Sequence, residues 1–164
     1  LAHALTILSE MKSNMLDHGD VFSQLGPTVR ISLALADGIK GTDYIKAQRV
    51  RTRALAAFDA AFAEVDAIIT PATAITAPPI PGPAAEEGGW SNLNNTTELM
   101  RFVFPGNLTG LPAIAFPAGY DPAGLPIGMQ AMGRHWEEHL LLRVACVAEQ
   151  FVERRRPQVF YPIL

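Results

Sequence analysis

Nucleophilic hydrolysis needs a serine or cysteine beside an activating base, and the chain offers no such arrangement in its sequence. None of its five serines stands in a Gly-x-Ser-x-Gly elbow, the sharp turn that exposes a nucleophile in many hydrolases. Lys12 and Ser13 are adjacent in a predicted helix, and adjacent helical residues do not face each other. Cys146, the single cysteine, lies in an apolar helical pattern that favours a small buried side chain. We therefore expect no catalytic residue among them.

Metal and cofactor chemistry is equally unsupported by the residue spacing. His135 and His139 are four residues apart and could share a helix face, but Trp136 follows His135 where the zinc pattern His-Glu-x-x-His requires Glu. The sequence suggests no third ligand, and exposed positions in a first helical turn explain both histidines. No Gly-rich phosphate loop follows a predicted strand. The sequence predicts neither a metal nor a cofactor.

The composition points to a globular chain that contacts another surface. The 164 residues suit one domain or a piece of a larger one. The chain is 49% hydrophobic and 18% charged, whereas soluble domains average about 25% charged residues. A net charge of −3 gives no reason to expect nucleic acid as a partner. The lone cysteine excludes an intrachain disulfide and fits a reducing compartment.

Hydrophobic periodicity and turn residues predict alternating helices and short strands. Thr42 or Asp43 is expected to cap the longest helix, Thr96 or Thr97 a later one, and Pro105-Gly106 is expected to break that later helix. Residues 71–90, rich in proline and glycine, are predicted to be irregular. The predicted helices cover residues 1–15, about 27–38, about 42–65, 95–104 and about 136–153, and the predicted strands cover 67–70, 113–116 and 127–132.

The three strands are apolar on both faces, which is typical of a sheet that helices cover on both sides. The second and third strands follow each other across the turn at residues 119–124, so they are expected to pair antiparallel. Three short strands do not complete such a sheet. The sequence therefore predicts an α/β sandwich whose remaining strands lie upstream.

Several motifs occur in a fixed order along the chain. Residues 107–114 read N-L-T-G-L-P-A-I, and 124–130 read G-L-P-I-G-M-Q before Met132-Gly133-Arg134. Upstream, residues 65–73 follow the pattern V-D-x-x-x-T-P-T/A-T, and Tyr44, Gln48 and Arg51 match the preceding helix. Together these motifs resemble the C-terminal part of the amidase-signature family. This resemblance implies that residues 1–164 are the C-terminal part of an amidase domain, an α/β sandwich with a mixed β-sheet covered by helices.

Three further segments resemble one branch of the family, the plant fatty acid amide hydrolases. They are residues 2–10, 96–103 and 157–164. This resemblance implies a hydrolase that cleaves the amide bond of N-acylethanolamines or other fatty acid amides. The implied partner is a small acyl amide, no nucleic acid is implied, and the resemblance leaves room for membrane-surface association of the whole protein and for a homodimer.

Family members use a Ser–cis-Ser–Lys triad in a Gly/Ser-rich segment upstream of the part that this chain resembles. The chain therefore lacks the triad, and alone it is expected to be inactive. The resemblance implies instead that it forms one wall of the acyl channel, with Thr96, Thr97, Met100 and Phe104 as substrate-binding residues. An apolar face with adaptable methionine and two hydroxyls suits such a wall, and a core position explains Met100 and Phe104 equally well.

Two other functions fit the same motifs. The glutamine-using subunits of glutamyl-tRNA(Gln) amidotransferases share the central motif, and their channel is expected to carry charged groups that recognise an amino acid. A non-catalytic binding or scaffold protein derived from an amidase is the third hypothesis. It predicts a chain that folds alone and a gene without an upstream Gly/Ser-rich signature.

Overall fold

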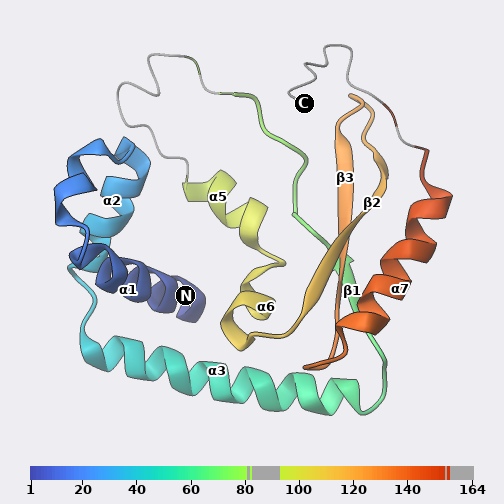
Figure 1. Cartoon of the computed structure of the whole chain (residues 1–164), viewed down its shortest axis with the longest axis horizontal. Helices are drawn as coiled ribbons and strands as arrows, with labels where there is room; N and C mark the ends of the chain where they lie inside the picture. Colours follow the sequence, from blue (N-terminus) through green and yellow to red (C-terminus); the bar gives the residue numbers. More distant parts are fainter. Residues whose placement is uncertain (81, 83–92, 154, 156–164) are drawn as a thin grey trace.

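A computed structural model describes residues 1–80, 82, 93–153 and 155 of the chain (Figure 1). The predicted α/β class is confirmed, because helices precede, separate and follow the strands of one small sheet. The elements in chain order are α1 (Ala2–Leu16), the 3-10 helix η1 (Gly19–Gln24), α2 (Pro27–Ala36), α3 (Gly41–Phe62), β1 (Ile68–Pro71), α5 (Leu93–Met100), α6 (Phe104–Thr109), β2 (Ala113–Tyr120), β3 (Pro126–Met132), α7 (Glu138–Ala148) and the 3-10 helix η2 (Glu149–Phe151).

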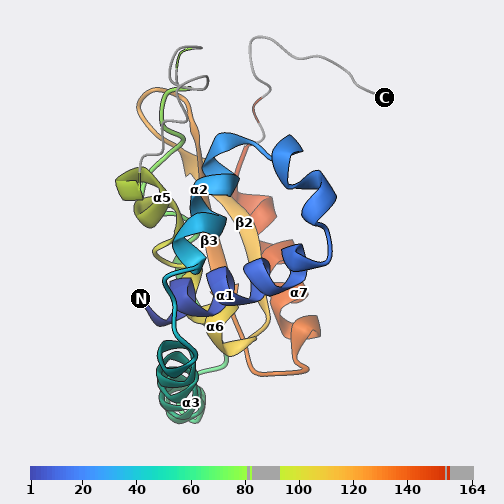
Figure 2. The same cartoon turned by 90° about the vertical axis from the view of Figure 1, so that its left-hand side faces the viewer.

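The long helix α3 runs beneath α1 and α6 (Figures 1 and 2). It begins at Gly41, so the prediction that Thr42 or Asp43 caps it is wrong. Lys40 precedes the helix, and the Asp43 carboxylate reaches back to accept a hydrogen bond from the backbone N–H of Lys40 at 3.3 Å. Asp43 thus satisfies an otherwise unpaired donor from the third helical position, as the acidic member of a capping box does.

The helix predicted over residues 95–104 is two short helices that meet at a turn. α5 ends at Met100, residues 101–103 form the turn, and α6 starts at Phe104 with Pro105 in its first turn. Pro105 begins a helix instead of breaking one, because the first turn needs no backbone donor from proline. Thr96 and Thr97 lie inside α5, so neither caps it.

The described strands form an antiparallel sheet in the order β1-β3-β2. The predicted antiparallel pairing of β2 with β3 is confirmed, and β2 extends four residues further than expected, to Tyr120. The register between β2 and β3 shifts between Pro117 and Gly119, and Gly119 has a φ of 133°, a value that glycine adopts without strain. The Asp121 carboxylate closes the following turn by accepting the backbone N–H groups of Ala123 and Leu125.

The end of β3 is covered on both faces. Gln130, Ala131 and Met132 are all buried, and successive strand residues point to opposite faces. Helix α7 packs on β2 and β3 from one side (Figure 1). On the other side, the turn between α5 and α6 contacts the Gln130 side chain. This arrangement explains why the strand, apart from Gln130, is apolar on both faces and shows no alternation of apolar and polar residues.

Arg134 fastens the end of β3 to the end of α3. Its guanidinium donates to the backbone carbonyl oxygens of Phe62 and Val65, at 2.5 and 3.0 Å from Nη2. It also pairs with the Glu137 carboxylate at 3.1 Å. Carbonyl groups at a helix end lack partners within the helix, so a cation with several donors is suited to this position.

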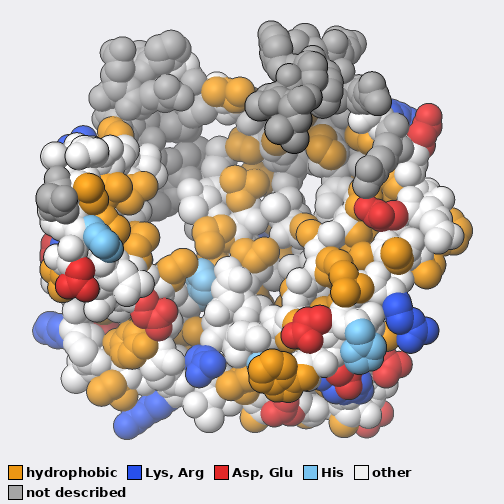
Figure 3. Space-filling model, in the orientation of Figure 1, with side chains coloured by type: hydrophobic (Ala, Val, Ile, Leu, Met, Phe, Trp, Pro, Cys, Tyr) orange, Lys and Arg blue, Asp and Glu red, His pale blue; other side chains and the backbone are white. Residues whose placement is uncertain are grey.

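Large apolar side chains remain exposed on several described helices. α7 buries Leu141 and Ala145 against the sheet, whereas Leu142 and Val147 are more than half exposed on its outer face. Cys146 is exposed on the same helix, so the prediction of a buried cysteine is wrong. The apolar pattern of α7 is wider than the face that the sheet covers. Figure 3 shows hydrophobic side chains at the surface of α2 and of α7. Within the described ranges, no helix is both long and apolar enough to cross a bilayer.

His3 links α1 to α6 through a buried aromatic contact. Its ring lies 4.8 Å from the Phe104 ring, centroid to centroid, with the planes tilted by 33°. The side chain is buried, and Nδ1 has no hydrogen-bond partner among the described residues. Burial lowers the pKa of His3 below its usual value. The imidazole is therefore neutral at pH 7.

Replacing Gly133 by alanine is expected to destabilise the fold. An added Cβ would lie 3.1 Å from Cδ2 of Leu141, which is buried and has little room to move. Overpacking of this kind costs about 1–3 kcal/mol. Urea denaturation should therefore give a lower free energy of unfolding for Gly133→Ala. The matched control is Gly41→Ala, where an added Cβ meets no atom within 4 Å. Equal stability of the two variants would contradict the close contact.

Acidification is expected to weaken the packing of α1 on α6 through His3. Because the folded pKa is lowered, the unfolded chain takes up the proton first as pH falls below about 6.5. The stabilisation is thus present above pH 6.5 and lost below it. Melting temperatures between pH 7.5 and 5 should fall less for His3→Leu than for the wild type. Ile7→Ala, at an exposed position of the same helix and without a titratable group, is the control and should keep the wild-type pH dependence.

Candidate functional site

The four predicted substrate-binding residues lie on α5 and at the start of α6. Thr96 and Thr97 are exposed in the middle of α5. Met100 is the last residue of α5 and Phe104 the first of α6, so they flank the turn at residues 101–103, and both are half-buried. We call residues 93–109 the α5–α6 wall. Phe104 is held from α1 by the His3 ring, which fits the core position expected as the alternative for this residue.

Three hydrogen bonds anchor the α5–α6 wall: near the end of α5, at the turn, and near the end of α6. Near the end of α5, the Glu98 carbonyl oxygen accepts the backbone N–H of Ala74 at 3.1 Å. Near the end of α6, the Leu108 carbonyl oxygen accepts Nε of Arg51 at 2.8 Å. At the turn, the Phe102 carbonyl oxygen accepts Nε2 of Gln130 at 2.7 Å. Elements far apart in the sequence therefore place the wall.

A cavity of about 460 Å³ lies beside the wall, between the segment after β1, the end of α5 and the start of β3. Its lining is mixed, with apolar Ile75, Phe102 and Ile127 and the hydroxyl of Thr73. Two charged residues of the lining, Glu98 and Arg101, form an ion pair with each other. The Thr73 hydroxyl donates to the Ile75 carbonyl oxygen at 2.7 Å. These polar groups are therefore already satisfied by partners within the chain.

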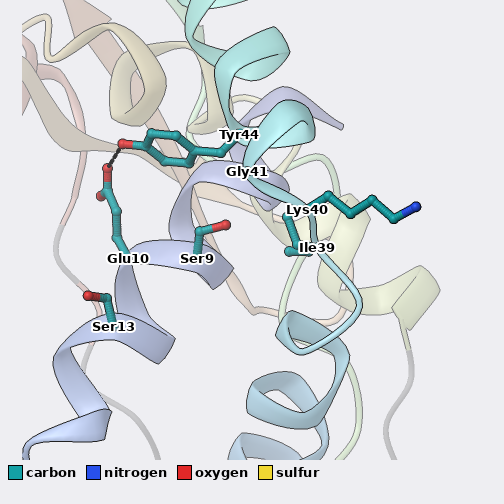
Figure 4. Close-up of a pocket in the computed structure, with 7 residues that line it drawn as sticks. All are labelled: Ser9, Glu10, Ser13, Ile39, Lys40, Gly41 and Tyr44. Atoms are coloured by element: carbon teal, nitrogen blue, oxygen red, sulfur yellow. Dashed lines mark hydrogen bonds between the residues drawn. The ribbon is translucent and has the colours of Figure 1, made fainter.

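A second cavity, of about 380 Å³, separates the middle of α1 from the start of α3 (Figure 4). The Glu10 carboxylate accepts a hydrogen bond from the Tyr44 hydroxyl at 3.0 Å, and this bond raises the pKa of Tyr44. The Lys40 side chain extends away from Glu10 and from the hydroxyl of Ser9 (Figure 4). The Ser9 hydroxyl donates to the Leu5 carbonyl oxygen at 2.7 Å.

The described serines and lysines do not form an activated nucleophile in this cavity. Lys12 Nζ pairs with the Asp37 carboxylate at 3.0 Å, and Ser13 is exposed on the neighbouring helical position. A serine nucleophile needs its base within about 3 Å. Lys12 therefore forms an ion pair that links α1 to the end of α2, and Ser13 takes no part in it.

The two histidines with helical spacing do not share a helix face. His135 lies in the turn before α7, His139 lies in its first turn, and both are exposed. Trp136 between them has a φ of 68°, which turns the chain before the helix begins. Among residues 1–80, 82, 93–153 and 155, no three His, Cys, Asp or Glu side chains are grouped so that they could hold a metal ion.

Sequence reasoning overlooked two residues that hold the α5–α6 wall, His3 and Gln130. Both are polar, both are buried, and both reach the wall from a distant element. Gln130 carried a signal, because it is the one polar residue between Met129 and Met132 in an otherwise apolar strand. A polar residue at such a position needs a partner. His3 carried no signal beyond its apolar neighbours.

Comparison with known proteins identifies the family. A family model described as Amidase matches residues 9–142, which is most of the chain. The fatty acid amide hydrolase of Medicago truncatula is 44% identical over 168 residues, and the match covers 99% of this chain and 27% of the relative. A glutamyl-tRNA(Gln) amidotransferase subunit of Picosynechococcus is 42% identical over 141 residues, covering 82% of this chain and 28% of the relative.

A solved structure of 6-aminohexanoate cyclic dimer hydrolase complexed with substrate has a similar fold. It superposes with a TM-score of 0.65 at 26% identity. The superposed part is 82% of this chain and 30% of the hydrolase chain. The chain thus spans about a quarter of the length of the curated relatives that it matches. The family model, the relatives and the fold agree with the motifs at residues 65–73 and 107–134. The chain belongs to the amidase-signature family.

Proposed function

We propose that residues 1–164 are the C-terminal part of an amidase domain that hydrolyses N-acylethanolamines or other fatty acid amides. The observation that carries this proposal is the extent of the similarity. The match with the plant fatty acid amide hydrolase covers 99% of the chain, whereas the family model stops at Leu142. The shared sequence therefore includes both ends of the chain, which lie outside the part common to the family.

The α5–α6 wall supports an apolar substrate. Met100 and Phe104 offer half-buried apolar surface, and an unbranched methionine adapts to a flexible acyl chain. The charged residues of the wall that line the neighbouring cavity, Glu98 and Arg101, are paired with each other. A site for an amino acid would instead need charged groups available to its ammonium and carboxylate. In this proposal Thr96 and Thr97 supply hydroxyls along the same helix.

The chain's own contribution to the reaction is binding and orientation. Hydrolysis of an amide requires a nucleophile, a base and donors for the developing oxyanion, and in this proposal these groups lie in the part upstream. The described serines and lysines do not combine into such a set. The α5–α6 wall would hold the acyl chain so that the carbonyl carbon meets the upstream nucleophile, which lowers the entropic part of the barrier.

Exposed apolar side chains support the view that the chain is a piece of a larger domain. Leu35, Ile45 and Leu142 are each more than half exposed on three different helices. A domain that folds alone places few such residues at its surface. The rest of an amidase domain is the natural cover for them.

A glutamyl-tRNA(Gln) amidotransferase is the second candidate, and the 42% identity to the Picosynechococcus protein favours it. That match covers less of the chain than the plant one does. The two candidates differ in the substrate: a long apolar acyl amide for the hydrolase, and glutamine for the amidotransferase.

The protein from the complete reading frame is expected to hydrolyse a long-chain N-acylethanolamine, and the 164-residue chain alone is expected to show no activity. The reason is that the nucleophile and its base lie upstream. The activity of both proteins is measured as release of ethanolamine from the N-acylethanolamine. A short-chain amide and glutamine are the comparison substrates, and their amine or ammonia product is measured in the same way. Activity of the isolated chain would refute the missing triad. If the protein turns over glutamine and neither acyl amide, the proposed hydrolase function is wrong and the amidotransferase is favoured.

Replacing Met100 by serine in that protein is expected to reduce kcat/KM about tenfold for a long acyl chain and much less for a short one. Burying a methionine side chain contributes about 1.5–3 kcal/mol, and a short acyl group does not reach this contact. Met100→Leu is the control, because leucine keeps an apolar side chain of similar volume at the same place, and it should keep the rates for both acyl lengths. A similar loss for both acyl lengths would assign Met100 to the core only.

A further inference from the structure

We propose that Gln130 is a positioning residue that sets the acyl-chain selectivity of the proposed hydrolase by fixing the turn between α5 and α6. The effect on selectivity rests on the proposed function. The positioning of the turn rests on the hydrogen bonds of the buried Gln130 amide. Gln130 lies on β3, the central strand of the described sheet, with 5% of its surface exposed.

The Gln130 amide bridges two segments that are far apart in the sequence. Its Nε2 lies 2.9 Å from the Thr70 hydroxyl oxygen on β1 and 2.7 Å from the Phe102 carbonyl oxygen in the turn. A carbonyl oxygen only accepts hydrogen bonds, so the amide nitrogen must be the atom that faces it. The two hydrogens of one amide group are thus divided between the sheet and the turn.

The bond to Phe102 acts at the point where the α5–α6 wall changes direction. The hydrogen bond from Val103 N–H to the Met100 carbonyl oxygen defines the shape of the turn but does not attach it to the sheet. The Ala74 bond holds Glu98 in the last turn of α5, and the Arg51 bond holds Leu108 near the end of α6, so neither of them reaches residues 101–103. Gln130 therefore fixes the angle between the helices, and with it the separation of Met100 and Phe104.

Losing this bond costs free energy because its donor, the Gln130 amide, is buried and water does not readily replace it. Removing the donor leaves the Phe102 carbonyl oxygen without this partner, and the turn then gains by moving toward water. The movement displaces Met100 and Phe104 together, since they flank the turn on either side. A long acyl chain that contacts both residues loses more than a short one that contacts neither. Selectivity for chain length is consequently the property that depends on Gln130.

The test is Gln130→Met in the protein from the complete reading frame. Methionine has nearly the same length and volume but offers no donor. The ratio of kcat/KM for a long-chain over a short-chain amide is expected to fall at least about 5-fold, which corresponds to about 1 kcal/mol. Amide hydrogen exchange, followed by mass spectrometry, is expected to speed up in the peptide that contains residues 101–107.

The matched control is Thr70→Val, which removes the other partner of the same amide but leaves the bond to Phe102. It should keep the selectivity ratio and the slow exchange of residues 101–107. An equal fall in kcat/KM for both amides in Gln130→Met, or the same change of selectivity in Thr70→Val, would overturn the positioning role.

The exchange measurement separates this inference from the proposed function. If the wild-type protein cleaves neither amide, the hydrolase proposal fails, and exchange still decides whether Gln130 holds the turn. Faster exchange confined to residues 101–107 supports the positioning of the wall. Unchanged exchange in Gln130→Met overturns it, whatever the substrate of the enzyme.

Discussion

The fully buried end of β3 is the constraint on which the described structure depends. β3 pairs with β1 on one side and with β2 on the other, and neighbouring residues on both of its faces are buried. Three residues at this end of the strand and just after it each contact a different element: Gln130 bonds the turn between α5 and α6, Gly133 leaves room for Leu141 of α7, and Arg134 bonds the end of α3. Because these contacts follow one another along five residues, a shift of the strand would disturb every layer at once.

This organisation supports the proposal that the segment contributes binding and orientation to an enzyme whose nucleophile lies elsewhere. The strand is rigid because its backbone is paired on both sides, and the α5–α6 wall is attached to it through a side-chain amide and not through a continuous helix. In the proposed hydrolase, a wall attached in this way would keep its position precise enough to hold a flexible acyl chain. Rigid support of a binding surface by hydrogen bonds from behind is a general requirement of selective sites.

The same chain leaves much of its helical surface apolar and uncovered. α3 buries only Ala47 and Phe62 along its 22 residues, and the outer face of α7 exposes Leu142 and Val147. The chain matches only about a quarter of the length of its relatives, which suggests why this apolar surface is uncovered. The remainder of an amidase domain would cover it, and burial of such surface is the main favourable contribution to association.

The sequence by itself determined the α/β class, the positions of the strands and the family, because apolar runs and Pro/Gly turns act locally and the motifs are contiguous. It did not determine where α5 ends, since Pro105 is compatible with both a break and a helix start. The exposure of Cys146 depended on how wide a face of α7 the sheet covers. The partners of His3 and Gln130 lie about 100 and 30 residues away in the sequence, at Phe104 and Phe102. Tertiary structure alone decides such contacts, because a buried polar side chain shows that it needs a partner but not which one.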